Sequence, residues 1–528
     1  MTFLKPRRAL LSVSDKTGLI PLAKALSENG CVLYASGGTR KALLEEGLPC
    51  LAVEDISGSP EAFQGRMKTL SFSLFGGILA RRGSEADDAD REKLRIPLID
   101  VVVVNFYPFT SAGLSATSDE LTELIDIGGP ALVRAGAKNQ KDVLVLADLS
   151  LYAETLEELK TQAGISADLR EKAAARAWES VRFYDEAIAR KFGAERESPL
   201  RYGENPHQSA TFRLANESPI DWKNPCTEAA VSYNNILDFS AGFRLLSDLA
   251  NWKPEAAHAV IIKHQNPCGV ATDADGRIAN ALDLAWACDP TSAFGGLVLL
   301  SRPLDADSAN FLQTRFIEGI AAPGLFPGSA ELTVVASKRK NLKAVTITQV
   351  DYQEKQTTVS VPGGTLAQAA DAFSLEKFEL KTEGVWRDAD TELAQFGVLV
   401  AKALKSNAIA IVENPTERCF RLLGAGQGQP NRIEAIEKLA IPRARAVLIT
   451  EARSGVASSE AFVNARLSAA LLVSDAFFPF ADAVEVAAAA GIKRIVEPGG
   501  SMRDNEVIAR ATELGVELAF TGVRHFRH

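Results

Sequence analysis

The stretch Ile261-Ile-Lys-His-Gln-Asn-Pro-Cys-Gly269 decides how this chain is interpreted. An apolar run that begins at Ala259 is typical of a buried strand, and it brings Lys263 and His264 to the strand end. The Asn266-Pro267 pair that follows predicts a turn. Ligands of α/β proteins bind at the carboxyl ends of strands. We therefore expect Lys263 and His264 to belong to a functional site, and the alternative is a solvated Lys-His pair on a loop.

The composition is that of a globular protein with several domains. A chain of 528 residues exceeds what one hydrophobic core supports, so we expect about two to four domains. The net charge of −9 argues against a general nucleic-acid binder, because such a protein carries a broad basic face. Local basic residues must therefore meet any anionic ligand.

The cysteines and the N-terminus predict a cytoplasmic protein. Six cysteines occur without any C-x-x-C pair, which disfavours a disulfide framework and a structural zinc site and suits a reducing cytosol. Lys5, Arg7 and Arg8 precede an apolar segment that is too short for a signal peptide. No run approaches the roughly 20 apolar residues of a membrane span, so we expect no membrane partner.

The N-terminal segment predicts a parallel sheet. Residues 9–13 and 31–35 have the pattern of strands, and residues 18–28 and 39–46 have the pattern of helices. Alternation of strands and helices is typical of an α/β fold with a parallel sheet. Residues 99–105 form an uninterrupted apolar run, which predicts a central strand buried on both faces.

Two polar loops in this segment indicate an anion site. Ser12-Val-Ser-Asp-Lys-Thr-Gly18 and Ser36-Gly-Gly-Thr39 each follow a strand and begin a helix. Backbone amides at a helix N-terminus, together with hydroxyls and a lysine, can cradle a phosphate. Ordinary N-caps are the alternative, since Ser and Thr are common capping residues. The later stretch Gly65-Arg-Met-Lys-Thr69 adds two cations and a hydroxyl.

A second group of polar residues follows the central strand. Asn105 and Tyr107 come at its end, and Asp126 stands before a Gly-Gly-Pro turn. Arg134 and Lys138 lie four residues apart and share one face of the helix expected there. A solvated basic face is the alternative. We expect four of the side chains to converge on one anionic substrate, namely Lys68, Tyr107, Asp126 and Lys138.

The remainder predicts a second domain built from two related lobes. Pro199 to Gln208 is rich in functional side chains and poor in apolar ones. The segment 405–412 repeats the combination of polar residues and an apolar strand, and Ser474 to Phe480 resembles Asp289 to Phe294. We therefore expect two α/β lobes with a cleft between them. The last eight residues are rich in Arg, His and Phe, and we expect Arg524 to be tied into the site.

Taken together, these motifs resemble the PurH family of bifunctional AICAR transformylase/IMP cyclohydrolase enzymes. The resemblance covers nearly the whole chain, because the following occur in order: SVSDKTG, ASGGT, GR-x-KTL, NFYPF, IDIGGP, LRYGENPHQ, IKHQNPCG, DPTSAFGG, KSNAI, SDAFFPF, EPGGSMRD and TGVRHFRH. It implies an α/β protein with a methylglyoxal-synthase-like parallel-sheet domain at 1–198. Residues 199–528 would form a pair of cytidine-deaminase-like lobes without zinc, and the lack of a C-x-x-C pair agrees with that.

The resemblance also implies the reactions and the partners. Formyl transfer from 10-formyltetrahydrofolate to AICAR would give FAICAR, and dehydrative ring closure would give IMP. A monovalent cation such as potassium and a homodimer are further implications. A rival interpretation is a lyase or deaminase that uses only one of these folds, and a non-enzymatic one is a nucleotide sensor.

Carried over position by position, the resemblance assigns the site residues. His264 would be the transformylase proton shuttle, Lys263 the group that steadies the transition state, and Asn407 a substrate-holding residue. The groups that would bind AICAR are Arg201, Tyr202, Gly295, Glu318 and Arg524, and those on the formyl-folate side are Arg432, Ile433, Phe477, Asp482 and Ser501. In the cyclohydrolase, Lys138 would transfer the proton, supported by Lys68, Tyr107 and Asp126. The nucleotide would bind Ser14, Asp15, Lys16, Ser36, Gly37, Gly38, Thr39, Arg66, Thr69 and Asn105.

The sequence departs from the family pattern in two places. Ser71-Phe72 replaces the usual His-Pro after KTL, which affects the rim of the cyclohydrolase pocket. Gly428 to Asn431 are extra residues before Arg432, which affects the assignment of Arg432 and Ile433. Neither departure touches the proposed catalytic groups.

Overall fold

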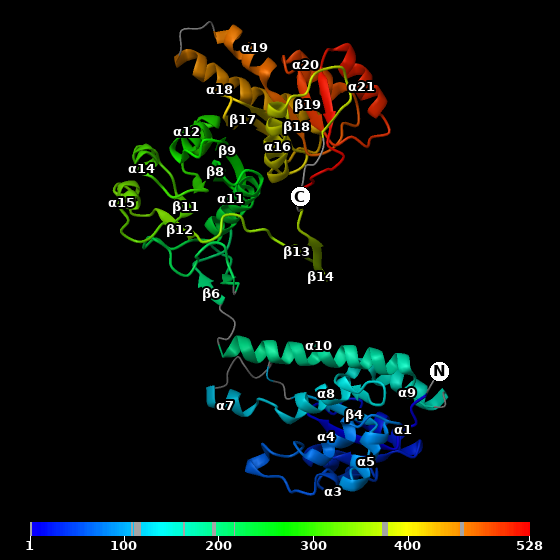
Figure 1. Ribbon diagram of the computed structural model, residues 1–528. Coiled ribbons are helices and arrows are strands. Elements are labelled where there is room, and N and C mark those ends of the chain that lie inside the picture. Colours follow the sequence, from blue (N-terminus) through cyan, green and yellow to red (C-terminus); the bar gives the residue numbers. More distant parts are fainter. Residues whose placement is uncertain are drawn as a thin grey trace. The chain divides into compact units, whose positions relative to one another are not determined.

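The computed structural model describes residues 3–106, 109, 118–161, 164–192, 197–215, 217–371, 378–454 and 459–528. The chain divides into two compact units, Met1–Arg196 and Glu197–His528 (Figure 1). Among the described residues, no helix combines the length and the apolar character needed to cross a bilayer.

Unit 1 contains a five-stranded parallel sheet in the order β3-β2-β1-β4-β5. The strands are β1 (Arg8–Val13), β2 (Val32–Ala35), β3 (Leu51–Ala52), β4 (Val101–Asn105) and β5 (Leu144–Leu146). The four valines of β4 are all buried, as predicted for a central strand covered on both faces. The helices are α1 (Leu19–Glu28), α2 (Gly37–Glu45), α3 (Glu54–Ser57), α4 (Phe72–Leu79), α5 (Glu85–Leu94), α7 (Ser118–Glu123), α8 (Gly128–Lys138), α9 (Tyr152–Thr161) and α10 (Ala167–Lys191), with 3₁₀ turns η1 (Phe63–Gly65) and η2 (Leu149–Leu151).

The parallel strands bring the polar loops of unit 1 to one edge of the sheet. The loops after β1, β2 and β4 all leave the carboxyl ends of strands, so they share that edge. Helix α8 runs from this edge back toward the amino ends of the strands, because the strand that follows it, β5, is parallel to β4. The loop edge is therefore where a ligand of unit 1 can be bound.

Unit 2 contains an eleven-stranded mixed sheet in the order β12-β11-β10-β8-β9-β17-β16-β18-β19-β20-β15. Its strands are β8 (Ala257–Lys263), β9 (Asn266–Asp273), β10 (Leu297–Leu300), β11 (Gly319–Pro323), β12 (Lys343–Ile347), β15 (Glu379–Leu380), β16 (Ile409–Glu413), β17 (Cys419–Gly426), β18 (Leu471–Ser474), β19 (Arg494–Glu497) and β20 (Glu517–Phe520). Two separate hairpins are formed by β6 (Glu197–Leu200) with β7 (Ala210–Arg213) and by β13 (Gln356–Val361) with β14 (Gly364–Ala369).

The sheet of unit 2 is an internal repeat, which is the pair of lobes that the sequence predicts. In each half, a hairpin of two antiparallel strands is followed by three strands on the outer side of its first strand, so β8 to β12 match β16 to β20. The halves join where β9 pairs with β17. The sequence segments chosen as the repeat are not equivalent, because Asp289 to Phe294 precede β10 whereas the stretch that begins at Ser474 follows β18.

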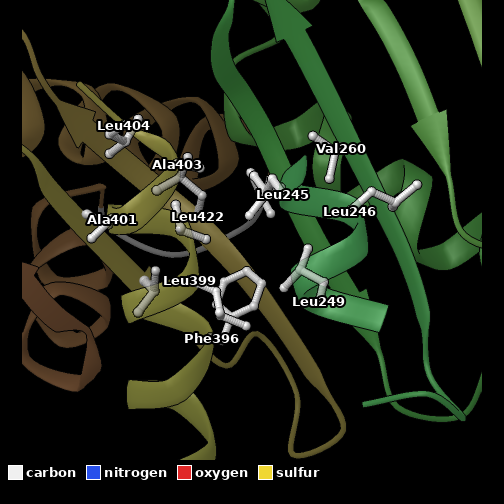
Figure 2. Packing of buried hydrophobic residues seen from close by; sticks show 14 of the residues in the cluster. Leu245, Leu246, Leu249, Val260, Phe396, Leu399, Ala401, Ala403, Leu404 and Leu422 are labelled. Carbon is white, nitrogen blue, oxygen red and sulfur yellow. The ribbon is translucent and has the colours of Figure 1, made fainter. Parts of the chain in front are cut away.

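Helices cover this sheet and connect the two halves. They are α11 (Tyr233–Trp252), α12 (Ile278–Cys288), α13 (Pro290–Ala293), α14 (Ala306–Gln313), α15 (Ala330–Ala336), α16 (Asp388–Ala403), α17 (Arg432–Glu434), the π-helical turn η3 (Ala435–Ala440), α18 (Ile441–Ser454), α19 (Ser459–Ala469), α20 (Asp482–Ala489) and α21 (Asp504–Glu513). Figure 2 shows Leu245 and Leu249 of α11 in the first lobe facing Phe396 of α16 in the second. This shared apolar cluster joins the lobes into one core.

The turn after Lys263 differs from the prediction. It occurs at His264 and Gln265, whose φ values are 53° and 63°, and Pro267 already belongs to β9. Two successive residues with positive φ are the geometry of the tight hairpin turns that match strand twist. The Asn-Pro pair therefore begins the second strand and does not make the turn.

A buried ion network crosses the second lobe, and its removal should be costly. Glu413 accepts hydrogen bonds from Arg421 Nε (2.7 Å) and Arg466 Nε (2.8 Å), and the side chains of Glu413 and Arg421 are both 3% exposed. We expect Glu413→Ala to lower the free energy of unfolding of unit 2 by about 3 kcal/mol, because the guanidinium groups of Arg421 and Arg466 are then left to share the single carboxylate of Glu451. Denaturant unfolding followed by tryptophan fluorescence measures this. The surface variant Lys438→Ala should cost less than about 1 kcal/mol, and an equal loss in both would contradict the prediction.

Candidate active sites

In unit 1, the side chain of Asn105 organises the loop after β1. Its Oδ1 accepts hydrogen bonds from the amides of Ser14 (2.6 Å) and Asp15 (2.9 Å), and its Nδ2 donates to the Asp15 carbonyl (2.7 Å). Thr39 of α2 exchanges hydrogen bonds with the backbone of Val13. The ends of β1 and β4 and the first turn of α2 are thereby held together.

Two lysines flank the N-terminus of α2. A Cβ placed on Gly38 would lie 3.9 Å from Lys16 Nζ, and one placed on Gly37 would lie 4.0 Å from Lys68 Nζ. The side chain of Ser36, the N-cap residue of α2, makes no capping hydrogen bond. Its Oγ instead lies 3.2 Å from Oγ of Ser12, within hydrogen-bond distance. Ammonium groups beside free helix amides favour an anion. A hollow of about 530 Å³ whose lining includes Gly37 and Arg40 lies beside this point.

Asp126 and Thr69 meet at the first turn of α8. Asp126 Oδ1 accepts a hydrogen bond from the Gly129 amide (2.8 Å), and burial raises the pKa of this carboxyl. A Cβ on Gly128 would come within 2.4 Å of Thr69 Oγ1, so glycine is required for this close approach. Arg66 lies on the surface and pairs with Glu123.

Two predicted residues of unit 1 are not brought to this point. Lys138 is the last residue of α8, about 15 Å along the helix axis from its start, and its neighbour Asn139 donates to carbonyl oxygens at the end of α4. It therefore lies at the opposite edge of the sheet from Asp126. Tyr107 lies outside the described residues.

In unit 2, the hairpin turn holds Lys263 and exposes His264. Lys263 Nζ donates to the Phe294 carbonyl (2.7 Å) and would lie 3.9 Å from a Cβ placed on Gly295. The amide of Gln265 donates to Asp238 (2.6 Å), which fixes the backbone beside His264. Burial raises the pKa of Asp238, and the nearby His264 opposes that rise. The imidazole of His264 is thus solvent-accessible on a rigid turn.

The second lobe contains a cavity of about 510 Å³. Five predicted site residues line it, together with seven others: Asn407, Arg432, Ile433, Phe477 and Asp482, with Pro430, Asn431, Ala476, Pro479, Phe480, Ala483 and Phe526. Arg432 is buried, forms an ion pair with Asp475 and donates to Asn407 Oδ1 (2.7 Å). Asn407 in turn donates to the Gln429 carbonyl (2.8 Å).

The C-terminal residues are attached to this second cluster. The amide of Ser406 donates to the Arg527 carbonyl (2.9 Å), and the amide of His525 donates to the Asp475 carbonyl (2.9 Å). Arg524 is exposed and its guanidinium lies 4.8 Å from the ring centroid of Phe526, which lines the cavity. The tail is therefore part of the wall of this site.

Both clusters of unit 2 lie at one edge of the large sheet. The three pairings from β8 to β16 are all antiparallel, so β16 begins at the edge where β8 ends. At the normal spacing of strands, Lys263 and Asn407 are separated by roughly 14 Å along that edge. One edge thus presents an exposed imidazole with a lysine and, three strands away, a cavity with a buried arginine.

Comparison with known proteins places the chain in a family. A family model described as "AICARFT/IMPCHase bienzyme" matches residues 136–443, and one described as "MGS-like domain" matches residues 18–131. A protein of Nostoc punctiforme named "Bifunctional purine biosynthesis protein PurH" is 40% identical over 547 residues, which is 99% of this chain and all of that protein. A protein of Halalkalibacterium halodurans with the same name is 38% identical over 548 residues, with the same coverage.

The chain belongs to the AICARFT/IMPCHase bienzyme family. It is a bifunctional enzyme of purine biosynthesis that combines AICAR transformylase and IMP cyclohydrolase. The MGS-like domain forms its N-terminal part. The single-fold lyase, the deaminase and the nucleotide sensor are thereby excluded as descriptions of the whole chain.

The remaining predicted residues of the bienzyme lie outside the 510 Å³ cavity, and the contacts of three of them are as follows. Arg201 lies with its guanidinium 5.5 Å from the Tyr202 ring centroid, in the turn after β6. The amide of Glu318 donates to the Gly296 carbonyl (3.0 Å), next to Gly295. Ser501 does not line the 510 Å³ cavity, but Arg503 in the same turn lies 4.8 Å from the ring centroid of its lining residue Phe480.

Sequence reasoning about the bienzyme missed several residues of unit 2. Asp475 binds Arg432, Asp238 fixes the turn at 264, and Phe480 and Phe526 line the cavity. Asp475 and Phe480 stand inside the quoted motif SDAFFPF, so a search for polar residues at strand ends could have found Asp475. Phe526 had no such signal, because its place depends on how the tail folds back.

Proposed function

We propose that the two reactions of the bienzyme occupy two separate centres, ring closure within residues 1–198 and formyl transfer within residues 199–528. The observation that carries this proposal is that each unit has its own polar site on one sheet edge. Unit 1 offers lysines at a helix N-terminus, and unit 2 offers an accessible imidazole and an aromatic cavity. A nucleotide phosphate suits the first, and a folate ring suits the second.

Formyl transfer needs a base and a cation at one carbon atom. The amine of AICAR attacks the formyl carbon, His264 takes the amine proton, and N10 of the folate receives a proton as it leaves. Lys263 stabilises the oxyanion of the tetrahedral intermediate. AICAR is proposed to bind Arg201, Tyr202, Gly295, Glu318, Asn407 and Arg524, and the formyl-folate is proposed to bind Arg432, Ile433, Phe477, Asp482 and Ser501.

Ring closure needs a cation at the formyl oxygen and a proton for the leaving hydroxide. The carboxamide nitrogen of FAICAR attacks the formyl carbon, and the resulting carbinol loses water. Lys68 beside the helix amides supports the first role, and Asp126 is a carboxyl whose pKa burial raises. Lys138 is proposed as the proton-transfer residue on the resemblance, together with Tyr107. The nucleotide is proposed to bind Ser14, Asp15, Lys16, Ser36, Gly37, Gly38, Thr39, Arg66, Thr69 and Asn105.

The experiment that tests this proposal follows both steps in one preparation. Purified protein is supplied with AICAR and 10-formyltetrahydrofolate, and IMP is measured alongside tetrahydrofolate. We expect stoichiometric formation of both products. Folded protein that forms neither would remove both catalytic assignments.

We also propose a homodimer in which the hairpin β13–β14 is buried. Nearly all its residues are exposed in the single chain, and the cross-strand pair Val359 and Leu366 is 60% and 63% exposed. An isolated two-stranded hairpin is marginal in water, so apolar side chains on it favour a second surface. A second copy of the chain would supply that surface.

Charging this apolar pair should dissociate the dimer. We expect Val359→Asp with Leu366→Asp to weaken association at least about tenfold, because two carboxylates would be buried without partners. Light scattering after size exclusion measures the mass. The matched control is Ser360→Asp with Thr365→Asp, the adjacent cross-strand pair on the other face of the hairpin. A wild-type mass of one chain, or equal effects of the two variants, would refute the proposal.

A potassium ion and a cytoplasmic location complete the proposal. A bound potassium ion needs several oxygen ligands. Asp475, a carboxylate near Asn407, is already engaged, because its two oxygens accept hydrogen bonds from Arg432 and Ser406. We therefore assign no ligands to the ion. Activity in potassium and in tetramethylammonium salts measures the potassium requirement.

The cytoplasmic location is supported by the cysteines. All six cysteines are free, which suits a reducing compartment.

A further inference from the structure

A buried carboxyl group, which forms no ion pair with any residue that the structure describes, is bonded to the loop that lines the 510 Å³ cavity. Glu497 ends β19, and its side chain is 0% exposed. Oε2 accepts hydrogen bonds from the amides of Phe478 (3.1 Å) and Gly499 (3.2 Å). Oε1 has no hydrogen-bond partner among the described residues. A buried acid with one unsatisfied oxygen is costly, so its retention calls for a role.

Glu497 joins the two loops that follow β18 and β19. Phe478 is fully buried, and its neighbours Phe477 and Pro479 line the cavity. The hydrogen bond to the Phe478 amide therefore fixes the stretch that carries the lining side chains. On the other side, the 499–501 turn is tightly seated, because a Cβ on Gly499 would come within 2.4 Å of the Phe520 ring. Both loops leave the sheet edge on which Asn407 lies.

We propose that Glu497 is a positioning residue for the formyl-folate cavity. Its carboxyl group holds the loop 476–480 in the geometry that binds the folate, through the hydrogen bond from the Phe478 amide, and does not touch the ligand. This inference rests on the proposed assignment of that cavity to the folate. The carboxyl sets the affinity for the folate co-substrate and leaves AICAR binding and ring closure unaffected.

The geometry also makes this positioning sensitive to pH. Burial, with a smaller contribution from Asp504, raises the pKa of Glu497 to about 7, and the hydrogen bonds from the Gly499 and Phe478 amides and the charge of Arg432 oppose the rise. Ionisation places a charge in the apolar interior, and water or a side chain must move to solvate it. We therefore expect the cavity to loosen as the pH rises through 7.

Stability should change in the same direction. The pKa of this carboxyl is raised in the folded state, so the folded protein retains a proton that the unfolded chain has lost above pH 4.5. The folded state is therefore destabilised progressively between about pH 4.5 and 7, and the loss levels off above 7. Glu497→Gln removes this dependence, because the amide keeps an acceptor for both backbone amides and does not ionise.

The test compares three variants at pH 6.5 and 8.5. We expect the KM for 10-formyltetrahydrofolate of the wild type to rise between these values and that of Glu497→Gln to stay flat. Glu497→Ala should raise this KM about tenfold, with the KM for AICAR and the cyclisation of supplied FAICAR unchanged. Phe477→Ala, which removes a lining ring, should raise the KM for the folate by a similar factor.

The outcomes separate the inference from the proposed function. An unchanged KM in Phe477→Ala would show that the folate does not use this cavity, and both proposals would fall. A raised KM in Phe477→Ala with a normal one in Glu497→Ala would overturn the inference alone. Equal rises of the KM for both substrates, or a pH profile of Glu497→Gln that follows the wild type, would reduce Glu497 to a structural residue. If Glu497→Ala does not fold, the pH profile of Glu497→Gln decides.

Discussion

His264→Ala should lower the rate of formyl transfer by about 10²- to 10⁴-fold, which is the usual contribution of a positioned acid-base group. The amine of AICAR is a weak nucleophile because it is conjugated with the ring, so it needs a base when it attacks the formyl carbon. His264 is exposed on a turn that Asp238 holds through the amide of Gln265, and Lys263 lies beside it. The imidazole can therefore reach a bound amine without a change of backbone.

The measurement is the initial rate of tetrahydrofolate release, with cyclisation of supplied FAICAR as the internal control. The variant should cyclise FAICAR at the normal rate, because His264 and the ring-closure residues belong to different units. Added imidazole should restore part of the lost formyl transfer. Equal loss of both activities, or unchanged formyl transfer, would contradict the assignment.

The strands were predictable because strands that are buried on both faces consist of short runs of apolar residues, which can be recognised in the sequence. Residues 9–13 and 31–35 were expected to form strands, and the structure has β1 and β2 there to within one residue at each end, while the apolar run at 99–105 identified the central strand β4. The loops after β1 and β2 followed from the same reasoning, since parallel strands place their carboxyl ends at one edge. Asn105 adds the hydrogen bonds that hold the first loop.

The turn and the cavity were not predictable in the same way. A tight hairpin turn is normally signalled by Asn-Gly or Asp-Gly, whereas this one uses His264 and Gln265, whose positive φ values depend on the pairing of the flanking strands. The cavity combines residues from the loop before β16, from α17 and from the tail with the stretch after β18, and their meeting depends on strand order. Residue spacing alone carries no information on such distant contacts.

Helix geometry explains why Lys138 could not be placed from sequence. Spacing showed that Arg134 and Lys138 share a helix face, but it did not show which end of the helix meets the ligand. In the structure, Asp126 precedes the first turn of α8 and Lys138 ends the last. The four side chains expected to converge therefore include one pair separated by the length of a helix.

Lys68→Ala should lower the rate of FAICAR cyclisation by about 10²- to 10³-fold and leave formyl transfer intact, because removing one donor to a developing oxyanion typically costs that much. Lys68 Nζ lies beside Gly37 at the N-terminus of α2 and forms an ion pair with Glu61 (3.2 Å) that a nucleotide anion can replace. The substrate oxygen and the helix amides would then share one positive region.

The same assay on Lys138→Ala tests two conflicting indications. The family resemblance makes Lys138 the proton-transfer residue, whereas the structure of the single chain places it at the opposite edge of the sheet from Asp126. As the proposed proton-transfer residue, Lys138 should also be required for cyclisation, with formyl transfer again unchanged. Lys141→Ala, three residues further along the chain, is the control for loss of positive charge at that edge of the sheet. Full cyclisation by Lys138→Ala would leave Lys68 and Asp126 to carry ring closure. Loss in Lys138→Ala with full activity in Lys68→Ala would move the reaction away from the α2 N-terminus.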